Sequence, residues 1–281
     1  MSVLETPDAV RAWVRERNRS GQRIALVPTM GFLHDGHVSL MREARARADV
    51  VAVSIFVNPT QFGPKEDLSR YPRDLAGDLQ KCEAAGVSVV YAPQPATVYP
   101  EGYQSYVTVE AVSQGMDGDR RPGHFRGVAT VVTKLLALFR PDVAVFGEKD
   151  YQQLQVITAL NADLELGAQI IGMPTRREAD GLAMSSRNSY LSPIDRVRAV
   201  ALSRGLFAAQ AAARAGETDV RALIALARAP LTEGAIREDY LEVRHAKTLA
   251  PLTTLTPAEP ARMLVAAFLG TTRLIDNLAL T

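Results

Sequence analysis

The sequence lacks the features that mark secreted, membrane-spanning and nucleic-acid-binding proteins. Its single cysteine, Cys82, cannot form an internal disulfide, which is typical of a protein from a reducing compartment. No apolar run approaches the ~18 residues that a membrane span needs, and the first residues show neither a basic nor an apolar leader segment. The 32 Lys and Arg residues balance 31 Asp and Glu residues, so the basic excess of nucleic-acid-binding proteins is absent. We therefore expect a cytoplasmic protein whose partners are neither membranes nor nucleic acids.

The GxxxxGK[ST] phosphate-binding loop is absent as well, yet one turn offers another way to bind a phosphate. The apolar run at 24–27 predicts a buried parallel strand that Pro28 and Gly31 break, and a helical pattern begins at Gly36. A strand, a tight turn and a helix together direct backbone N–H groups and the helix dipole toward an anion. His34 and His37 lie in this turn, at a spacing that places both on one side. The pattern predicts a phosphate site, and the alternative is a structural turn in which the histidines are caps.

Strands and helices alternate as far as residue 175, which predicts an α/β fold with a Rossmann-like, doubly wound parallel sheet. Beyond that boundary the pattern changes, and a smaller α+β C-terminal domain is predicted. We therefore divide the chain into domains 1–175 and 176–281. The strands expected in the first domain are 24–27, 50–57, 87–91, 142–146 and 169–173, with a short one at 106–109; the second domain is expected to hold one long helix at 193–215, another at 219–229 and three strands.

Polar loops follow three of the predicted strands, and ligands bind at the carboxyl ends of strands in doubly wound sheets. One of these loops carries Lys149 shortly after Gly147, where a ligand could approach the backbone. The connector into the second domain carries Ser185, Ser186 and Arg187, which suit the binding of a polyphosphate. The alternatives are a solvated helix cap at Lys149 and a serine-rich linker.

Three further polar side chains lie in or beside these loops. The amides of Gln61 and Gln153 could hydrogen-bond a hydroxyl and a carboxylate without titrating, although most glutamines are only surface residues. His124 belongs to a basic, glycine-containing segment that could act as a lid over an anionic substrate. The residues by themselves predict an α/β enzyme that acts on nucleotide phosphates, but they do not reveal the acid or the acceptor.

Six segments give the chain a close, full-length resemblance to the pantothenate synthetase (pantoate–β-alanine ligase) family. The first contains the HxGH pattern, which alone marks only a wider superfamily of nucleotidylyltransferases, while the other five, in this order, are specific to one family. The segments are PTMGFLHDGH (28–37), SIFVNPTQF (54–62), RPGHF (121–125), FGEKDYQQL (146–154), READGLAMSSRN (177–188) and LGTTRLIDN (269–277).

The resemblance implies an AMP-forming ligase of pantothenate and coenzyme A biosynthesis that makes an amide bond in two steps. Pantoate and ATP would give an enzyme-bound pantoyl adenylate and pyrophosphate, after which β-alanine would attack the acyl carbon to release pantothenate and AMP. Mg²⁺ would accompany ATP, ligated mostly by phosphate oxygens and water. The resemblance also implies a homodimer, and a C-terminal domain that forms a lid over the ATP site.

The resemblance assigns roles to residues of the matching segments, and it assigns no protein ligand to the metal. The catalytic set comprises His34, His37, Lys149, Ser185, Ser186 and Arg187, with His37 as the acid or donor. The ATP-binding set comprises Met30, Gly31, Phe32, Leu33, His34, Asp35, Gly36, His37, Gly147, Glu148, Lys149, Asp150, Arg176, Met184, Ser185, Ser186 and Arg187. Pantoate is assigned to Gln61 and Gln153, β-alanine to Gln61, and supporting roles to Asn58, Tyr71 and His124.

Three other functions fit parts of the pattern. Another HxGH nucleotidylyltransferase would transfer a nucleotide and form no amide. A catalytically silent nucleotide-binding protein would be expected to lack one of the catalytic residues, and none is missing. An RNA-binding role, through distant likeness to class I aminoacyl-tRNA synthetases, is disfavoured by the balanced charge.

Overall fold

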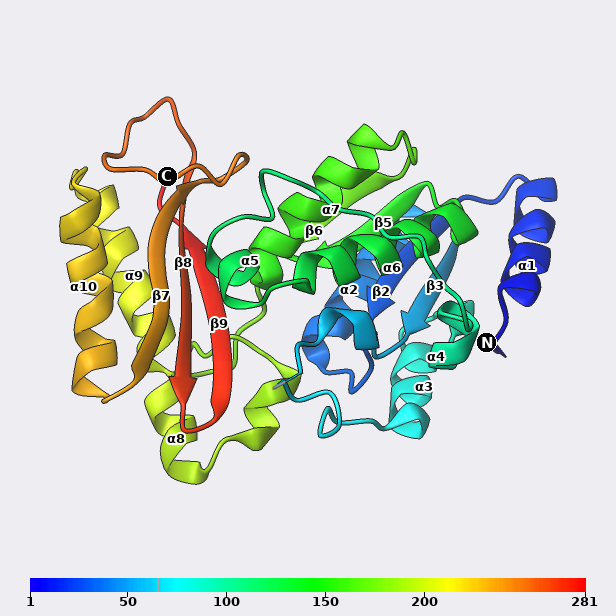
Figure 1. Ribbon diagram of the computed structural model, residues 1–281, viewed down its shortest axis with the longest axis horizontal. Helices are drawn as coiled ribbons and strands as arrows, with labels where there is room; N and C mark the ends of the chain where they lie inside the picture. Colours follow the sequence, from blue (N-terminus) through cyan, green and yellow to red (C-terminus); the bar gives the residue numbers. More distant parts are fainter. Residues whose placement is uncertain (65) are drawn as a thin grey trace. The chain divides into compact units, whose positions relative to one another are not determined.

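The computed structural model describes residues 1–64 and 66–281 and divides into two compact units (Figure 1). A short segment around Lys149 groups with the second unit, although it lies in the first two thirds of the sequence. The first unit comprises Met1–Glu148 and Gln152–Pro174, and the second comprises Lys149–Tyr151 and Thr175–Thr281.

The first unit contains a six-stranded sheet in the order β1-β4-β3-β2-β5-β6, and every neighbouring pair in it is parallel. The predicted α/β fold with a parallel sheet is therefore confirmed. The strands are β1 (Ser2–Leu4), β2 (Ile24–Thr29), β3 (Val50–Ile55), β4 (Val89–Tyr91), β5 (Val143–Gly147) and β6 (Gln169–Met173).

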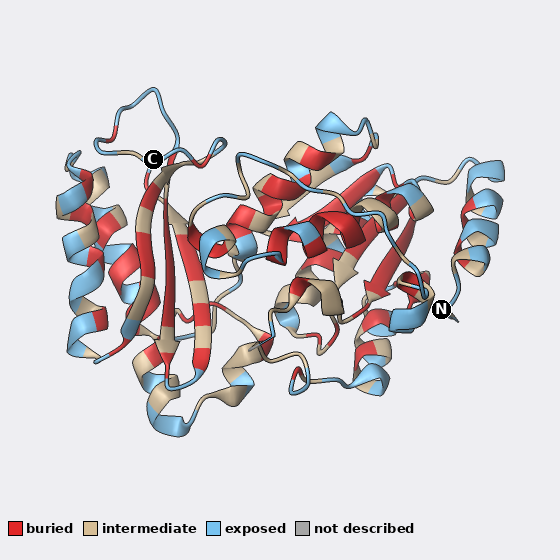
Figure 2. Ribbon diagram, in the orientation of Figure 1, coloured by how far each residue is buried: buried red, intermediate tan, exposed pale blue. Residues whose placement is uncertain are grey.

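Both faces of this sheet are covered, because alternate residues of each strand enter different cores. In β2, Ile24 and Leu26 lie in one core, while Ala25 and Val27 lie in the other. Figure 2 shows the central strands as buried along most of their length, and only their carboxyl-terminal residues are half-buried. The first core receives side chains from α1 (Pro7–Arg19), α6 (His124–Phe139) and α7 (Tyr151–Asp163), and the second receives them from α2 (Asp35–Arg47) and α3 (Leu75–Ala84).

Two local predictions about the first unit were wrong. Pro28 does not end its strand: β2 continues to Thr29, and Pro28 is paired with Ser54 of β3. The missing N–H is tolerated because β2 pairs with β5 only at Ala25 and Leu26, so here it has one neighbour. Segment 106–109 is not a strand.

The segment at 106–109 packs on helix α6 instead of pairing with the sheet. The backbone N–H of Val107 donates to Thr130 Oγ1 at 3.0 Å, and the guanidinium of Arg126 lies 3.7 Å from the ring centre of Tyr106. Its apolar alternation therefore reflects contact with a helix. The first unit also contains the short helices η1 (Pro59–Gln61), α4 (Pro95–Val98) and α5 (Met116–Arg120). The short helix η2 (Glu148–Asp150) lies mostly in the segment that groups with the second unit.

The second unit is a three-stranded antiparallel sheet with helices packed on it, which confirms the predicted α+β character. Leu206 and Leu223 of the helices share a core with Met263 and Val265 of the central strand. The elements are η3 (Ser186–Tyr190), α8 (Pro193–Ala199), α9 (Ala201–Arg214), α10 (Val220–Glu233), β7 (Arg237–His245), β8 (Ala261–Leu269) and β9 (Thr272–Ala279).

The single helix expected at 193–215 is in fact two helices, α8 and α9, which meet at Val200. Arg198 in α8 donates from Nε to the carbonyl oxygen of Gly234 at 2.8 Å and from Nη2 to that of Ala235 at 2.8 Å. These tertiary bonds hold α8 against the end of α10, and helical periodicity carries no sign of them. Among the described residues, no helix has both the length and the apolar character needed to cross a bilayer.

Candidate active site

The sheet places the histidine turn at its topological switch point. From β2 the chain continues to β3 and β4 on one side, whereas β5 and β6 lie on the other side. In open α/β sheets, ligands bind outside the carboxyl ends of the strands at this point. The histidine turn follows the carboxyl end of β2, and the segment that begins at Gly147 follows the carboxyl end of β5.

A buried carboxylate that the sequence analysis missed holds the turn after β2. Asp78 of α3 is 1% exposed and accepts hydrogen bonds from the backbone N–H groups of Phe32 (2.8 Å) and Leu33 (2.7 Å). Gly31 has φ +81°, and a Cβ there would lie 2.9 Å from Asp78 Oδ2, so only glycine fits. Burial raises the pKa of Asp78, against the lowering effect of the two backbone bonds. The sequence does contain an indication of this buried carboxylate: Asp78 lies on the apolar face of the predicted helix, four residues before Cys82.

The two histidines form a reciprocal cap on helix α2. His34 is the N-cap, and its Nδ1 accepts from the backbone N–H of Gly36 at 3.2 Å. His37 Nδ1 accepts from the backbone N–H of His34 at 3.3 Å, and the ring centres lie 4.1 Å apart. Since Nδ1 accepts in both rings, the ring proton is on Nε2 in each. The two caps therefore also present two N–H donors.

A buried amide network orients Gln61, which is 8% exposed on η1. Asn58 is 1% exposed, and its Nδ2 donates to Gln61 Oε1 at 3.1 Å and to the Gly127 carbonyl at 3.1 Å. Its Oδ1 accepts from the hydroxyl of Tyr99 at 2.8 Å. Burial raises the pKa of Tyr99 to about 12, so this hydroxyl stays protonated. Because Gln61 Oε1 is an acceptor for Asn58, its Nε2 group faces Met30 Sδ at 3.2 Å as a donor.

His124 holds the same residue from its backbone side. It is 7% exposed, and its Nδ1 lies 2.9 Å from the carbonyl oxygen of Gln61 and its Nε2 lies 3.0 Å from Arg121 Nη1. Since the carbonyl accepts and the guanidinium donates, the ring is neutral with its proton on Nδ1. Burial, reinforced by the charge of Arg121, lowers the pKa of His124 to about 4. Arg121 is itself paired with Glu66 at 2.8 Å, and the lid role of this segment stays a prediction.

The burial and contacts of Gln153, Tyr71 and Gly147, three other predicted residues of the first unit, are as follows. Gln152 is buried, and its Nε2 donates to the carbonyl oxygens of Val112 and Gln114 at 3.1 Å, whereas the neighbouring Gln153 is half-buried. Tyr71 is 6% exposed and packs edge-on against Phe62, with ring centres 5.8 Å apart. A Cβ at Gly147 would meet no atom within 4 Å, so there is open space on the side of this backbone where a side chain would project.

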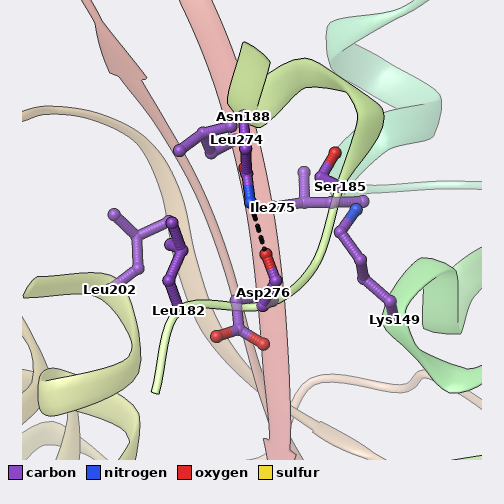
Figure 3. A pocket seen from close by; sticks show the side chains of 9 residues that line it. Lys149, Leu182, Ser185, Asn188, Leu202, Leu274, Ile275 and Asp276 are labelled. Atoms are coloured by element: carbon purple, nitrogen blue, oxygen red, sulfur yellow. Dashed lines mark hydrogen bonds between the residues drawn. The ribbon is translucent and has the colours of Figure 1, made fainter. Parts of the chain in front are cut away.

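In the second unit, Lys149 and the serine loop line one small pocket (Figure 3). The side chain of Lys149 points toward Ser185, which caps η3 by accepting from the N–H of Arg187 at 3.3 Å. Asn188 donates to the carbonyl oxygen of Ala183 at 3.1 Å, the bond drawn in Figure 3. The pocket is lined by Lys149, Leu182, Ala183, Ser185, Asn188, Leu202, Leu274, Ile275 and Asp276.

The other predicted ATP-binding residues of this unit are neighbours in sequence of Lys149 and Ser185 or precede them in the same connector. Ser186 is 9% exposed, whereas Arg176 is exposed, and its carbonyl accepts from the N–H of Met184 at 2.9 Å. Lys149 Nζ lies 3.9 Å from Asp150 Oδ2. Across the described part of the chain, no three His, Cys, Asp or Glu residues are grouped so that they could hold a metal ion.

Comparison with known proteins gives one consistent result. The family model described as pantoate-beta-alanine ligase matches residues 2–279. A pantothenate synthetase from Myxococcus xanthus is 66% identical over 99% of this chain and 96% of its own, and one from Anaeromyxobacter dehalogenans is 57% identical over 98% and 97%.

Solved structures agree with the sequence comparison. The pantothenate synthetase of Thermus thermophilus superposes with a TM-score of 0.94 at 43% identity, covering 100% of this chain and 99% of that one. The pantoate–β-alanine ligase of Francisella tularensis, solved in complex with β-γ ATP and β-alanine, superposes with a TM-score of 0.81 at 33% identity, covering 100% and 98%. With the histidine turn, the amide network and the lysine pocket in place, this chain belongs to the pantoate–β-alanine ligase family.

Proposed function

We propose that this chain condenses (R)-pantoate with β-alanine to pantothenate, at the expense of ATP, through a pantoyl-adenylate intermediate. The observation that carries the proposal is membership of the ligase family over residues 2–279. The complex of the Francisella tularensis relative with β-γ ATP and β-alanine supports these two molecules as substrates here.

The chemistry needs two steps because a free carboxylate is a poor acyl donor. In the first step, a pantoate carboxylate oxygen attacks the α-phosphorus of ATP and pyrophosphate leaves. In the second, the amine of β-alanine attacks the acyl carbon of the adenylate and AMP leaves. No covalent enzyme intermediate is required, so the protein contributes mainly positioning and electrostatic stabilisation of the phosphoryl charge.

The two units supply donors of different kinds for the phosphates. The Nδ1 atoms of His34 and His37 accept from the backbone at the start of helix α2, and we assign both rings to phosphate oxygens, with His37 as the acid. Lys149 is assigned to charge at the α-phosphate. Ser185 and Arg187, together with Ser186, are assigned to the departing pyrophosphate; hydroxyl and guanidinium groups suit it because each donates to oxyanions.

The amide network supports a donor role for Gln61 toward pantoate. Its Nε2 group is directed by Asn58 and lies beside Met30, whereas Oε1 is already an acceptor. An oriented N–H donor suits a hydroxyl or carboxylate oxygen. We assign pantoate to Gln61 and Gln153, and β-alanine also to Gln61, with Asn58, Tyr71 and His124 as supporting residues.

The remaining assignments concern nucleotide contacts, metal and assembly. Mg²⁺ would stabilise the phosphate charge of ATP, and phosphate oxygens and water are its proposed ligands. We also propose a homodimer, a cytoplasmic reaction and a lid function for the second unit. Further nucleotide contacts are proposed for Met30, Gly31, Phe32, Leu33, Asp35, Gly36, Gly147, Glu148, Asp150, Arg176 and Met184.

Product analysis tests the proposed function directly. Purified protein is incubated with ATP, Mg²⁺ and pantoate, with β-alanine present or withheld, and AMP, pyrophosphate and pantothenate are quantified. We expect AMP and pantothenate in equal amounts only when β-alanine is added. Pyrophosphate release that does not depend on pantoate would contradict the proposal and indicate a different nucleotidyl acceptor.

A further inference from the structure

The segment 269–277 has no role in the proposed reaction, yet its last two residues contact the elements that carry the phosphate-binding groups. Asn277 of β9 is 3% exposed, and its Nδ2 donates to the carbonyl oxygen of Lys149 at 2.8 Å. Its Oδ1 accepts from Arg262 Nη1 at 2.5 Å. The cation fixes which end of the amide faces Lys149, so this bond holds the lysine backbone in one position.

Asp276 makes the corresponding contact with the segment that leads to the serines. It is 3% exposed and accepts from Arg177 Nη1 at 2.6 Å and Nη2 at 3.0 Å. Arg177 also donates to the carbonyl oxygen of Gly181 at 3.0 Å and pairs as an isolated bridge with Ala183. The bidentate pair therefore fixes the chain two residues before Ser185.

Adjacent residues of a strand point to opposite faces, so one stretch of β9 reaches two different segments. Asp276 and Ser185 line the same pocket as Lys149, as Figure 3 shows. A buried ion pair contributes little net stability because desolvation offsets the attraction between its charges. Its two parallel bonds do restrict geometry, and geometry is what an adenylation site requires.

We propose that Asp276 and Asn277 are positioning residues that hold Lys149 and the Ser185–Arg187 loop in register for adenylate formation. This role rests on the proposed function. It assigns neither residue to the substrate. Both act through the groups that they hold, so they affect the step in which pyrophosphate leaves more than the step in which the amide forms.

The test measures the two half-reactions separately in Asn277→Ala and Asp276→Asn. Single-turnover pyrophosphate release from ATP and pantoate should fall by about 10²-fold, the loss expected for a misplacement of about 1 Å. The rate of aminolysis of chemically prepared pantoyl adenylate by β-alanine should also fall, but the fold-loss should be smaller than that of pyrophosphate release by a factor of about ten or more. The reason is that pyrophosphate is absent from that step. Circular dichroism and the melting temperature report whether each variant is folded.

Arg273→Gln is the matched control, because Arg273 lies on the same strand and its guanidinium pairs with Asp239 of the neighbouring sheet strand β7 at 2.9 Å. It should change the melting temperature without separating the half-reactions. Equal losses in both half-reactions, or no loss in either variant, would overturn the positioning role alone. A wild-type protein that releases no pyrophosphate from pantoate and ATP would overturn the proposed function, and this role with it.

Discussion

The three histidines of the first unit carry their ring protons on different nitrogens, for a reason found in their partners. His34 and His37 accept backbone N–H bonds at Nδ1, so each donates through Nε2. His124 instead contacts a carbonyl at Nδ1 and a guanidinium at Nε2, so its proton lies on Nδ1. The Nδ1 atoms of the first two therefore cap helix α2, while both ring nitrogens of the third contact protein groups.

Lys149→Ala tests the charge that we assign to the α-phosphate. Removing one donor that stabilises developing charge typically costs about 10²–10³ in rate, and we expect that loss in single-turnover adenylation. Lys247→Ala is a matched control because Lys247 is an exposed lysine of the same unit. Near-wild-type adenylation by Lys149→Ala, with the melting temperature unchanged, would refute the role.

The lowered pKa of His124 predicts that the free energy of unfolding depends on pH. Its pKa is about 4 in the folded chain against 6.5 as the ordinary value, so the unfolded chain binds the extra proton between these values. The stabilisation is complete above about pH 6.5 and is lost as the pH falls toward 4; at 1.36 kcal/mol per pKa unit it amounts to about 3 kcal/mol.

The measurement is urea unfolding of wild type and His124→Asn at several pH values from 7 to 4.5. Asn can still donate to the Gln61 carbonyl but does not titrate, so we expect a flatter pH profile of the unfolding free energy for the variant. If the pH profiles of wild type and His124→Asn are parallel, a group other than His124 causes the pH dependence of stability.

At the scale of elements, helix α6 and the short helix η1 meet at a glycine that the sequence analysis did not single out. A Cβ on Gly127 would lie 2.4 Å from the carbonyl oxygen of Thr60 and 2.6 Å from the backbone N of Gln61. Because these are backbone atoms, they cannot rotate away, and η1 would have to move. The glycine therefore determines where the Gln61 amide lies.

Gly127→Ala should destabilise the fold by about 1–3 kcal/mol, as overpacking does, and should raise the KM for pantoate more than that for ATP. The control is Gly63→Ala, where the added Cβ would make an ordinary contact of 3.7 Å with Glu66. Steady-state kinetics with each substrate varied in turn is the measurement. An equal rise in both KM values would argue against selective displacement of η1.

At the scale of the whole molecule, the chain has separate hydrophobic cores in its two units, and ATP contacts are proposed in both. Hydrogen exchange with and without a non-hydrolysable ATP analogue tests this. Protection should increase in peptides covering 28–40 and in those covering 180–190, because a ligand that contacts both segments stabilises both. Protection in only one unit would remove the other unit's residues from the nucleotide site.

Local patterns were enough to identify the parallel sheet, the histidine turn and the lysine and serine loops. Unbroken β-branched runs indicate doubly buried strands, and the six motif segments identified the family before any coordinates. The same patterns did not predict the end of β2 or the structure of segment 106–109. Pro28 is tolerated because the strand has one neighbour there, and segment 106–109 packs on a helix.

What only the tertiary structure decided is how functional side chains are held. Asp78 reaches Phe32 and Leu33 across 46 and 45 residues, and Asn277 reaches Lys149 across 128. Periodicity and propensity describe residues within a few turns of each other, whereas hydrogen bonds between distant segments form only when the packed cores bring those segments together. The sequence therefore determined the elements and their chemical groups, and packing decided which of those groups come into contact.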